Sequence, residues 1–406
     1  MDHEHVTRTP PMKIALLIQN ADRRSGGAEG YTLDLARSLT SRGHKVTVIS
    51  EGGPAAVAES AQASGFRCMY VGASGGTRWK RMQDFIHRLK DVYENQSYEI
   101  VHAMLPCWKC DVYQPHSGLA MDLLLTGHLK HTSKFKQRWA RFFNTYNLKR
   151  KGLARIERSM MEHQPWIFCL SSAMREFARS QFALPESHLV TLMNGIDLVK
   201  FDPAIGARSR DAVREEWRVE KEHQLALFVG NNWKLKGVPE AITALALTRD
   251  PKLRLMLVGR DERGPYKKLA HRLKVADRVI FVGSVSDPRP FYGAGDFLLL
   301  PSRRDTCSLV VLEALAMGLP VVSTKQNGSS EVVEEGRQGF VLENCNPKKL
   351  AESLQAICKP GRLRDMGQAA LAMRPTLSFE HHVTKIEAVY SQIVAARKQP
   401  GNAEVV

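Results

Sequence analysis

Two carboxylates near the C-terminal end of the chain stand out because of the residues around them. Glu313 is the only polar side chain in the apolar run 309–317, and Asp305 comes eight residues earlier. A helix that is apolar on every face is a buried helix. A buried carboxylate needs partners, because an unpaired one costs several kcal/mol or takes up a proton. We therefore expect Glu313 to meet either a cation or the hydrogen-bond donors of a ligand.

Three further features could bind an anion. Two of them offer backbone amides at the start of a predicted helix, where the helix dipole favours negative charge. The third is a pair of lysines directly after a predicted strand, which suits a pyrophosphate. Taken singly, a glycine pair also fits a tight turn and surface lysines are also simply solvated. Together the features indicate a diphosphate ligand, and their residues are Gly26 and Gly27, the lysines Lys234 and Lys236, and Cys307, Ser308 and Leu309.

The elements that would position these residues form two similar halves. The first half opens with an apolar run at 12–19, an amphipathic segment at 31–44 and a second strand at 45–50. The second half restarts with a strand at 225–230 and a helix at 239–247, followed by four more strand-like runs. This alternation predicts an α/β protein with two facing, doubly wound, Rossmann-like domains. Ligands of such sheets bind at the carboxyl ends of the strands, which predicts a site in the cleft between the domains.

The expected domain limits follow from these patterns. Residues 1–11 read as a disordered tail, 12–202 as the N-terminal domain, and 203–377 as the C-terminal domain, joined through a polar stretch near 202–223. Residues 378–397 predict an amphipathic helix with Val383, Ile386, Tyr390 and Ile393 on one face.

Composition narrows the class of protein. The chain has 406 residues, and no apolar run in it reaches the ~18–20 residues of a membrane span. No signal peptide is visible, and seven scattered cysteines suit a reducing cytoplasm better than a disulfide framework. Cys107 and Cys110 have metal-site spacing, but no second pair accompanies them, so free thiols are the favoured interpretation.

The formal net charge of +16 is concentrated in residues 130–158, which hold ten Lys or Arg, one acidic residue (Glu157) and several aromatic residues. A solvated helix with inward-facing aromatics is one interpretation. An anionic lipid surface is a second, and nucleic acid is a third. The residues assigned to a membrane surface are Lys134, Lys136, Arg138, Trp139, Arg141, Lys149, Arg150 and Lys151.

Several segments resemble those of one enzyme family. "DTCSLVVLEALAMGLPVVST" (305–324) resembles the Glu-x7-Glu motif of the retaining GT-B glycosyltransferases of family 4, and "VTLMNGIDLVKFDP" (190–203) resembles their interdomain segment. "SSAMREFA", "FVGNNWKLKG" and "LVGRD" follow the family's order, and the resemblance runs from residue 12 to about 397. Within the family, "GNNWKLKG" and "DVYQPHSG" are most similar to the lipopolysaccharide core glucosyltransferase I group.

The resemblance implies roles for single residues. Glu313 matches the glutamate that holds the ribose hydroxyls of a nucleotide sugar, and Asp305 matches the one that contacts the donor sugar, one methylene shorter than usual. Lys236 matches the phosphate-binding lysine, and the amides of Cys307 to Leu309 would hold sugar or phosphate. Asn231 replaces an arginine common in the family, whose charge Lys234 could supply. His116 matches the histidine beside the reacting centre.

The resemblance also implies the reaction and its setting. It predicts a metal-independent, retaining hexosyltransferase without a cofactor, with UDP-glucose as the favoured donor and a lipid-linked glycan such as a lipopolysaccharide core as acceptor. The enzyme would be cytoplasmic and peripheral on the inner face of the inner membrane. The C-terminal helix would cross back to the first domain, with hinges near Gly195 and Ser378. Alternatives are a soluble transferase of the sucrose or glycogen type, and a non-catalytic protein that binds nucleic acid, which Asp305 and Asn231 favour as departures from the family.

Overall fold

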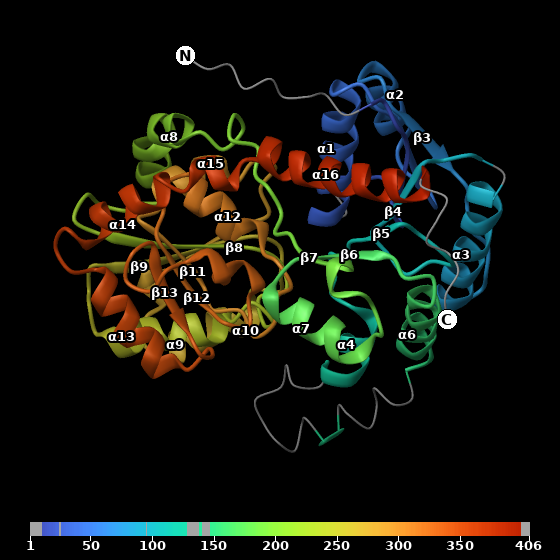
Figure 1. Ribbon diagram of the computed structural model, residues 1–406. Coiled ribbons are helices and arrows are strands. Elements are labelled where there is room, and N and C mark those ends of the chain that lie inside the picture. The colour runs from blue at the N-terminus through green and yellow to red at the C-terminus, as the bar shows by residue number, and fades with distance from the viewer. Residues whose placement is uncertain (1–9, 24–25, 95, 128–137, 140–146, 399–406) are drawn as a thin grey trace, which may run out of the picture. The chain divides into compact units, whose positions relative to one another are not determined.

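The computed structural model describes residues 10–23, 26–94, 96–127, 138–139 and 147–398. The chain forms two compact units (Figure 1). Residues 193–381 make the second unit, and the chain before and after them makes the first. The units part at 192/193 and 381/382, whereas the sequence predicted 202/203 and 377/378.

The first unit is built on a parallel sheet in the order β3-β2-β1-β4-β5-β6-β7. Its strands are β1 (Lys13–Leu17), β2 (Lys45–Ser50), β3 (Arg67–Tyr70), β4 (Ile100–Ala103), β5 (Val112–Tyr113), β6 (Trp166–Cys169) and β7 (Leu189–Thr191). Its helices are α1 (Gly27–Ser41), α2 (Ala55–Ala63), α3 (Arg78–Glu94), α4 (Ala120–Thr126), α6 (Leu148–Met161), α7 (Ser172–Gln181) and α16 (Phe379–Lys398), with the short turn η1 (Glu186–His188).

The second unit has a parallel sheet in the order β10-β9-β8-β11-β12-β13. Its strands are β8 (Gln224–Val229), β9 (Leu253–Val258), β10 (Val279–Gly283), β11 (Phe297–Leu300), β12 (Val321–Thr324) and β13 (Gly339–Leu342). Its helices are α8 (Pro203–Glu216), α9 (Val238–Thr248), α10 (Gly264–Arg272), α11 (Arg289–Ala294), α12 (Leu309–Ala316), α13 (Pro347–Ile357), α14 (Arg362–Leu371) and α15 (Arg374–Leu377), with the turns η2 (Ala276–Arg278) and η3 (Gly328–Val332). Figure 1 shows α9, α10 and α13 on one side of this sheet and α12 on the other.

Both sheets are doubly wound, as predicted, because the apolar strands are buried on both faces by helices. In each unit the strand order reverses at one point, between β1 and β4 and between β8 and β11. The carboxyl ends of the strands at such a reversal form the crevice in which open α/β sheets bind ligands.

Helix α12 has the predicted character and limits. Val311, Leu312, Ala314 and Leu315 are fully buried, and the helix ends at Met317 and Gly318, whose φ of 80° suits a glycine C-terminal to a helix. The polar stretch after residue 202 differs from the expectation of a connecting segment. It forms α8, because the Asp202 side chain accepts a hydrogen bond from the Ala204 amide and Pro203 starts the helix.

Helix α16 completes the first unit, from residue 382 onward. Its Glu387 accepts a hydrogen bond from His44 Nε2 at 2.9 Å and pairs with Arg42 at 2.5 Å. Farther along, Arg397 pairs with Asp111. The predicted apolar stripe of Val383, Ile386, Tyr390 and Ile393 is buried.

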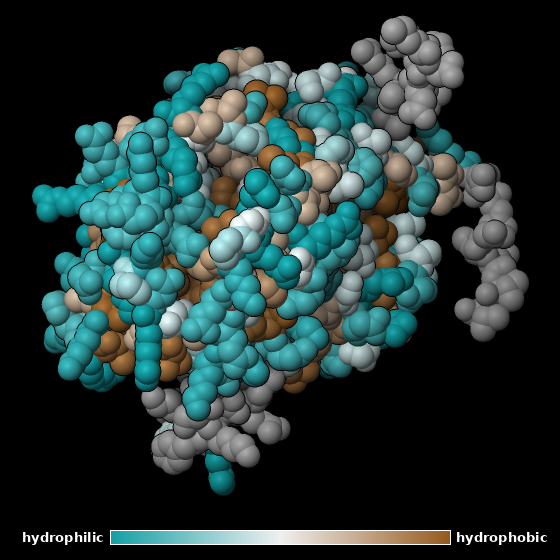
Figure 2. Space-filling model, turned by 90° about the vertical axis from the view of Figure 1, so that its left-hand side faces the viewer, coloured by the Kyte–Doolittle hydropathy of each residue, from teal (hydrophilic) through white to brown (hydrophobic). Residues whose placement is uncertain are grey.

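No helix in the described part of the chain combines the length and apolar character needed to cross a bilayer. Figure 2 shows one face of the molecule, on which hydrophilic side chains predominate and hydrophobic ones lie in small scattered groups.

Candidate functional site

The predicted donor residues of the second unit lie on the loops at its topological switch point. The loop after β8 carries Lys236, and the loop after β11 carries Asp305. Their side chains form an ion pair, although they are 69 positions apart in sequence. Backbone hydrogen bonds join the two loops from Arg303 N to Leu235 O at 2.8 Å. The structure thus brings together two groups that were predicted to share a ligand.

Close packing fixes the Lys236 loop. Trp233 is fully buried, and its ring nitrogen donates to Gly230 O at 2.8 Å. Gly237 follows Lys236 with a φ of 84°, and a Cβ there would lie 2.0 Å from Pro301 O. Only glycine tolerates that conformation and that approach. A side chain at 237 would therefore push the two loops apart.

The Asp305 loop is tied to the segment after β12. Asp305 N donates to Gln326 O at 2.8 Å, and Gly328 N donates to Asp305 O at 3.0 Å. Neighbouring strand ends therefore hold the Asp305 backbone in place. The carboxylate lies on a rigid support, which a group that must align a substrate requires.

The start of α12 has an unpaired hydroxyl, while the Ser308 amide already donates to Asn327 Oδ1 at 3.4 Å. Ser308 is the N-cap residue, but its side chain makes no capping hydrogen bond, and its buried Oγ has no partner among the described residues. The adjoining Cys307 Sγ lies 3.3 Å from Ser329 Oγ, and burial raises the pKa of its thiol to about 11, so the sulfur is neutral. The predicted positions Cys307, Ser308 and Leu309 thus present a helix N-terminus and an unpaired hydroxyl, which together suit an anion or a sugar hydroxyl.

Glu313 lies on α12, and its partner is a tyrosine rather than the cation considered from the sequence. Tyr292 OH, fully buried on α11, donates to Glu313 Oε2 at 2.6 Å. Burial raises the pKa of Glu313, while the Tyr292 hydrogen bond and the charge of Lys200 oppose that rise. No hydrogen bond to the other carboxylate oxygen is present among the described residues. That oxygen remains available to a ligand hydroxyl.

Asn231 and Lys234 take different places on the β8 loop. Asn231 Oδ1 accepts a hydrogen bond from the Arg260 amide at 2.7 Å, so it serves to hold the loop after β9. Lys234 is exposed and has no ion-pair partner in the described chain. The idea that Lys234 replaces a missing cation stays a prediction.

In the first unit, Gly26 and Gly27 stand at the start of α1 and are exposed. The carboxylate of Glu29 lies close over Gly26, where a Cβ would be 2.7 Å from its Oε2. A glutamate at the third helical position commonly reaches back to the helix start in this way. An anion that binds these amides would have to displace that carboxylate.

His116 lies in a group of buried aromatic and polar side chains that we call the histidine cluster: Tyr31, His102, Gln114, His116, His382 and Tyr390. The ring centroids of His116 and Tyr31 are 4.5 Å apart. His116 is half-buried as a residue, and its Nε2 is buried without a hydrogen-bond partner among the described residues. Burial lowers the pKa of His116 to about 3, so the imidazole is neutral at pH 7.

Comparison with known proteins finds a matching family model for each half of the chain. Residues 25–200 match the family model described as Glycosyltransferase Family 4, and residues 223–359 match the one described as Glycosyl transferases group 1. Each of these two segments thus matches a glycosyltransferase domain.

Two curated relatives illustrate the breadth of these glycosyltransferases. A D-inositol 3-phosphate glycosyltransferase of Corynebacterium efficiens is 30% identical over 51% of this chain and 51% of its own. An N-acetyl-alpha-D-glucosaminyl L-malate synthase of Bacillus anthracis is 26% identical over 52% of this chain and 55% of its own. The chain thus spans about half the length of these two curated relatives.

Solved structures show the fold over nearly the whole chain. WaaG, a glycosyltransferase involved in lipopolysaccharide biosynthesis, has a TM-score of 0.73 at 20% identity and covers 93% of this chain and 99% of its own. Anabaena HepE, solved with UDP-glucose, has a TM-score of 0.69 at 19% identity over 94% and 100%. A sucrose-phosphate synthase from Thermosynechococcus elongatus reaches 0.70 at 19% identity over 95% and 100%. The fold of the glycosyltransferase domain pair is therefore GT-B.

Much of the predicted membrane surface lies outside the described residues, namely Lys134, Lys136 and Arg141. Arg138 and Trp139 are exposed, as are Lys149 and Lys151 on α6, whereas Arg150 is half-buried. Glu157, the one acidic residue of this stretch, faces inward from α6. Its carboxylate accepts hydrogen bonds from Tyr113 OH at 2.7 Å and from the Ala120 and Met121 amides at 2.8 Å each. The exposed side of α6 is consequently basic without a compensating acid.

The cysteine pair of the first glycosyltransferase domain is a packing feature. Cys107 and Cys110 are free thiols, both are buried, and their sulfurs lie 3.7 Å and 3.6 Å from Met160 Sδ. Within the described chain, no group of three or more histidine, cysteine or acidic residues is arranged to hold a metal ion.

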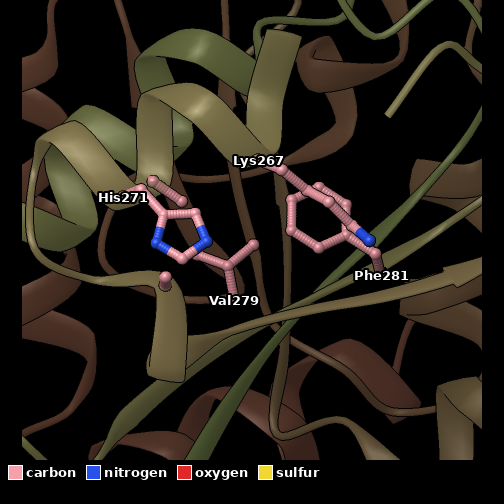
Figure 3. Close-up of a pocket in the computed structure, with 6 residues that line it drawn as sticks. Lys267, His271, Val279 and Phe281 are labelled. Carbon is pink, nitrogen blue, oxygen red and sulfur yellow. The ribbon is translucent and has the colours of Figure 1, made fainter. Parts of the chain in front are cut away.

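A surface pocket of about 330 Å³ lies elsewhere on the second glycosyltransferase domain. Figure 3 shows Lys267 and His271 of α10 beside Val279 and Phe281 of β10. Val279 is the first residue of the edge strand, so the pocket is not at the carboxyl end of that strand. None of the predicted donor residues lines it, and we assign it no role in transfer.

Sequence reasoning missed the residues that support the predicted ones. Tyr292 supports Glu313, Trp233 anchors the Lys236 loop, and Tyr31 lies against His116. Nothing in the local sequence marks these residues, because each acts on a segment that is distant along the chain. The one clue in the sequence was the residue type, because a buried Tyr or Trp needs a hydrogen-bond partner for its polar atom.

Proposed function

We propose that this protein is a retaining glycosyltransferase that transfers a hexose from a nucleotide sugar, with UDP-glucose favoured, to a lipid-linked glycan. The observation that carries the proposal is the convergence of Lys236, Asp305 and the start of α12, with its unpaired Ser308 hydroxyl, at the β8/β11 switch point. A cation, a carboxylate and a helix N-terminus are the groups that a diphosphate-linked sugar requires.

The ion pair between Lys236 and Asp305 accounts for both groups in the absence of substrate. Both side chains are about four-fifths buried, and a charge left unpaired there would be costly. A diphosphate carries more negative charge than one carboxylate, so it would compete for Lys236. Asp305 would then turn to hydroxyls of the donor sugar.

Glu313 would hold the ribose. A carboxylate with one oxygen fixed by Tyr292 offers the other to a ribose hydroxyl. Its burial makes that hydrogen bond strong, since the local dielectric is low and the carboxylate is charged. This would explain why the protein tolerates a buried glutamate whose ionisation is disfavoured.

The reaction that we propose breaks the bond between the anomeric carbon and the leaving phosphate while the acceptor oxygen approaches from the same face. The leaving diphosphate takes the proton of the acceptor hydroxyl. Lys236 and the α12 amides stabilise the charge on the phosphate, which is electrostatic catalysis and needs no divalent metal or cofactor. His116, as a neutral imidazole, would stand at the reacting centre.

Three lines of support concern the donor and the acceptor. HepE, which shares the fold, was solved with UDP-glucose, and WaaG, which also shares it, acts in lipopolysaccharide biosynthesis. The exposed basic side chains of α6 suit an anionic membrane surface, where each is worth ~1 kcal/mol. We therefore propose a peripheral enzyme at the inner face of the inner membrane, with a lipopolysaccharide core as the acceptor.

A second candidate is a transferase with a small, soluble, phosphorylated acceptor. The relative from Corynebacterium efficiens is named for D-inositol 3-phosphate. The solved sucrose-phosphate synthase shares the fold of this chain. Such an enzyme would not depend on lipid.

Calorimetric titration with UDP, GDP and ADP tests the centre of the proposal. We expect one nucleotide, UDP, to bind at micromolar strength to the wild type and to lose at least tenfold in affinity in Glu313→Ala. If no nucleotide binds, the transferase proposal is wrong. Turnover of UDP-glucose with a vesicle-borne glycan or with inositol 3-phosphate then separates the two acceptor classes.

A further inference from the structure

The histidine cluster joins three distant segments of the first unit through one side chain, Tyr31. Tyr31 comes from α1, and its hydroxyl donates to Gln114 Oε1 at 3.1 Å. The same hydroxyl lies 2.6 Å from Nε2 of His382 on α16, which is 351 positions away in sequence. Because a hydroxyl has one proton, the His382 N–H donates to the tyrosine oxygen when that proton goes to Gln114.

Tyr31 also defines one wall around His116. Its ring packs on the His116 ring at 4.5 Å with an interplanar angle of 53°, and it meets the His382 ring edge-on at 5.5 Å. Gln114 precedes His116 by two residues on the same loop. Tyr31 therefore touches the His116 loop twice, once through its hydroxyl on Gln114 and once through its ring on His116.

The surroundings of His116 make this support necessary. No side-chain hydrogen bond within the described residues fixes its ring, so its orientation depends on packing. In an ordinary acid–base histidine, a carboxylate orients the ring through the second nitrogen. Here the cluster contains no Asp or Glu, and the tyrosine wall is the rigid element next to the imidazole.

We propose that Tyr31 and His382 are positioning residues that hold His116 for the transfer reaction, with α16 supplying the outer support. This proposal rests on the proposed function, because it assigns His116 to the reacting centre. Tyr31 and His382 need not touch the substrate. They act by keeping the Tyr31 ring fixed against His116.

A double-mutant cycle separates positioning from a general effect on the fold. In Tyr31→Phe the ring remains and only the hydroxyl is lost, so we expect kcat with UDP-glucose to fall about 10-fold and KM for the donor to stay within about twofold. His382→Leu should have a similar effect, and His382→Gln should recover most of the activity because its amide keeps a hydrogen-bonding group near the same place. Tyr98→Phe is the matched control, since Tyr98 OH also donates to a glutamine, Gln96, at 2.6 Å.

The decisive comparison is made in the His116→Ala background. If Tyr31 acts through His116, Tyr31→Phe should change kcat by less than about twofold there. An equal loss in both backgrounds would overturn the proposal, because the hydroxyl would then act independently of His116.

Histidine NMR makes the test independent of activity. With ring-labelled histidine, the His116 signals can be assigned from the His116→Ala spectrum. We expect Tyr31→Phe to shift these signals and Tyr98→Phe to leave them in place. Unshifted signals in Tyr31→Phe overturn the positioning role. Shifted signals in a protein that transfers no sugar would instead show that the proposed function is at fault.

Discussion

The switch-point loops of the second unit carry charged side chains, whereas the histidine cluster of the first unit carries neutral ones, although both are built on the same kind of sheet. Both adjoin the strand ends of a parallel, doubly wound sheet. The loops hold ionised groups in pairs: Lys236 pairs with Asp305, and Arg303 pairs with Glu240 in the first turn of α9. The cluster holds imidazole, phenol and amide groups, and burial lowers the pKa of both His102 and His116.

The contrast fits the glycosyl transfer that we propose. Negative charge builds up on a leaving diphosphate, and fixed cations stabilise it. An oxocarbenium-like centre gains positive charge, and a protonated histidine beside it would repel that charge. A neutral imidazole avoids this repulsion while it keeps a hydrogen-bonding nitrogen. We infer that burial, rather than a partner residue, sets the charge state of His116.

The largest expected effect comes from removing a cation from the switch-point loops. Lys236→Ala removes the cation that we propose faces the leaving phosphate, and we expect kcat to fall ~100-fold or more, about 3 kcal/mol. Lys234→Ala should cost less than about tenfold, because Lys234 is exposed and a solvated cation stabilises charge weakly. The measurement is the rate of UDP release from UDP-glucose. Equal losses in the two variants would mean that Lys234 shares the phosphate.

The second largest effect is expected from adding a charge to the histidine cluster. Gln114→Glu places a carboxylate among buried imidazoles, and we expect the free energy of unfolding at pH 8 to fall by about 3 kcal/mol. The carboxylate should raise the pKa of a neighbouring histidine, so part of the loss should return as the pH falls toward 6 and that histidine protonates. Urea unfolding at both pH values measures this, with the exposed Gln62→Glu as control. A loss that does not depend on pH would show that the histidines do not respond to the new charge.

Glu313→Gln tests whether the buried carboxylate is kept for binding at the expense of stability. Burial raises the pKa of Glu313, so its ionised form destabilises the fold above pH 4.5. We expect the glutamine variant to unfold at a higher temperature at pH 8, with the difference disappearing below pH 4.5. UDP affinity should fall about 10- to 100-fold, since a charged hydrogen bond of about 1.5–3 kcal/mol is lost. Glu352→Gln, at an exposed position, should change neither quantity; a lower melting temperature in Glu313→Gln would contradict the argument.

The smallest effect is the pH dependence of the cluster itself. The pKa of His116 is about 3 in the folded protein and about 6.5 in the unfolded chain. Its contribution to stability is therefore present above pH 6.5 and is lost as the pH falls, by up to about 1.4 kcal/mol per pH unit. Unfolding of the wild type and of His116→Asn at pH 6.5 and pH 5 measures the difference. Equal slopes for the two proteins would mean that folding does not lower the pKa of His116.

The sequence predicted most strands and helices of the fold, because they follow from local patterns of apolar and polar residues. Buried parallel strands read as continuous apolar runs, and β1, β2, β8, β9 and β11 were all predicted from them. The strands that escaped prediction are short: β5 has two residues, β7 has three and β13 has four. Helix α8 escaped because its surface is polar, although Asp202 and Pro203 are residues typical of a helix start.

The candidate site was predictable in its chemistry and not in its contacts. Glu313 could be recognised as a buried carboxylate, but the sequence could not name Tyr292 as its donor, since a hydroxyl on another helix leaves no local mark. Lys236 and Asp305 were assigned to one ligand, and their direct pairing emerged only in the structure. The support of His116 by Tyr31 and His382 required tertiary structure, because it depends on where α16 packs.

The packing of α16 has a consequence for the order in which the protein is made. The helix supplies Glu387 to His44, Tyr390 to His102 and His382 to Tyr31, yet it is synthesised after the whole second unit. A domain that emerges early from the ribosome usually folds early. Here the nascent first unit lacks the contacts of α16 until the end of synthesis. The second unit, which is continuous in sequence, can fold before then. The last unit to be completed is therefore the one whose synthesis began first.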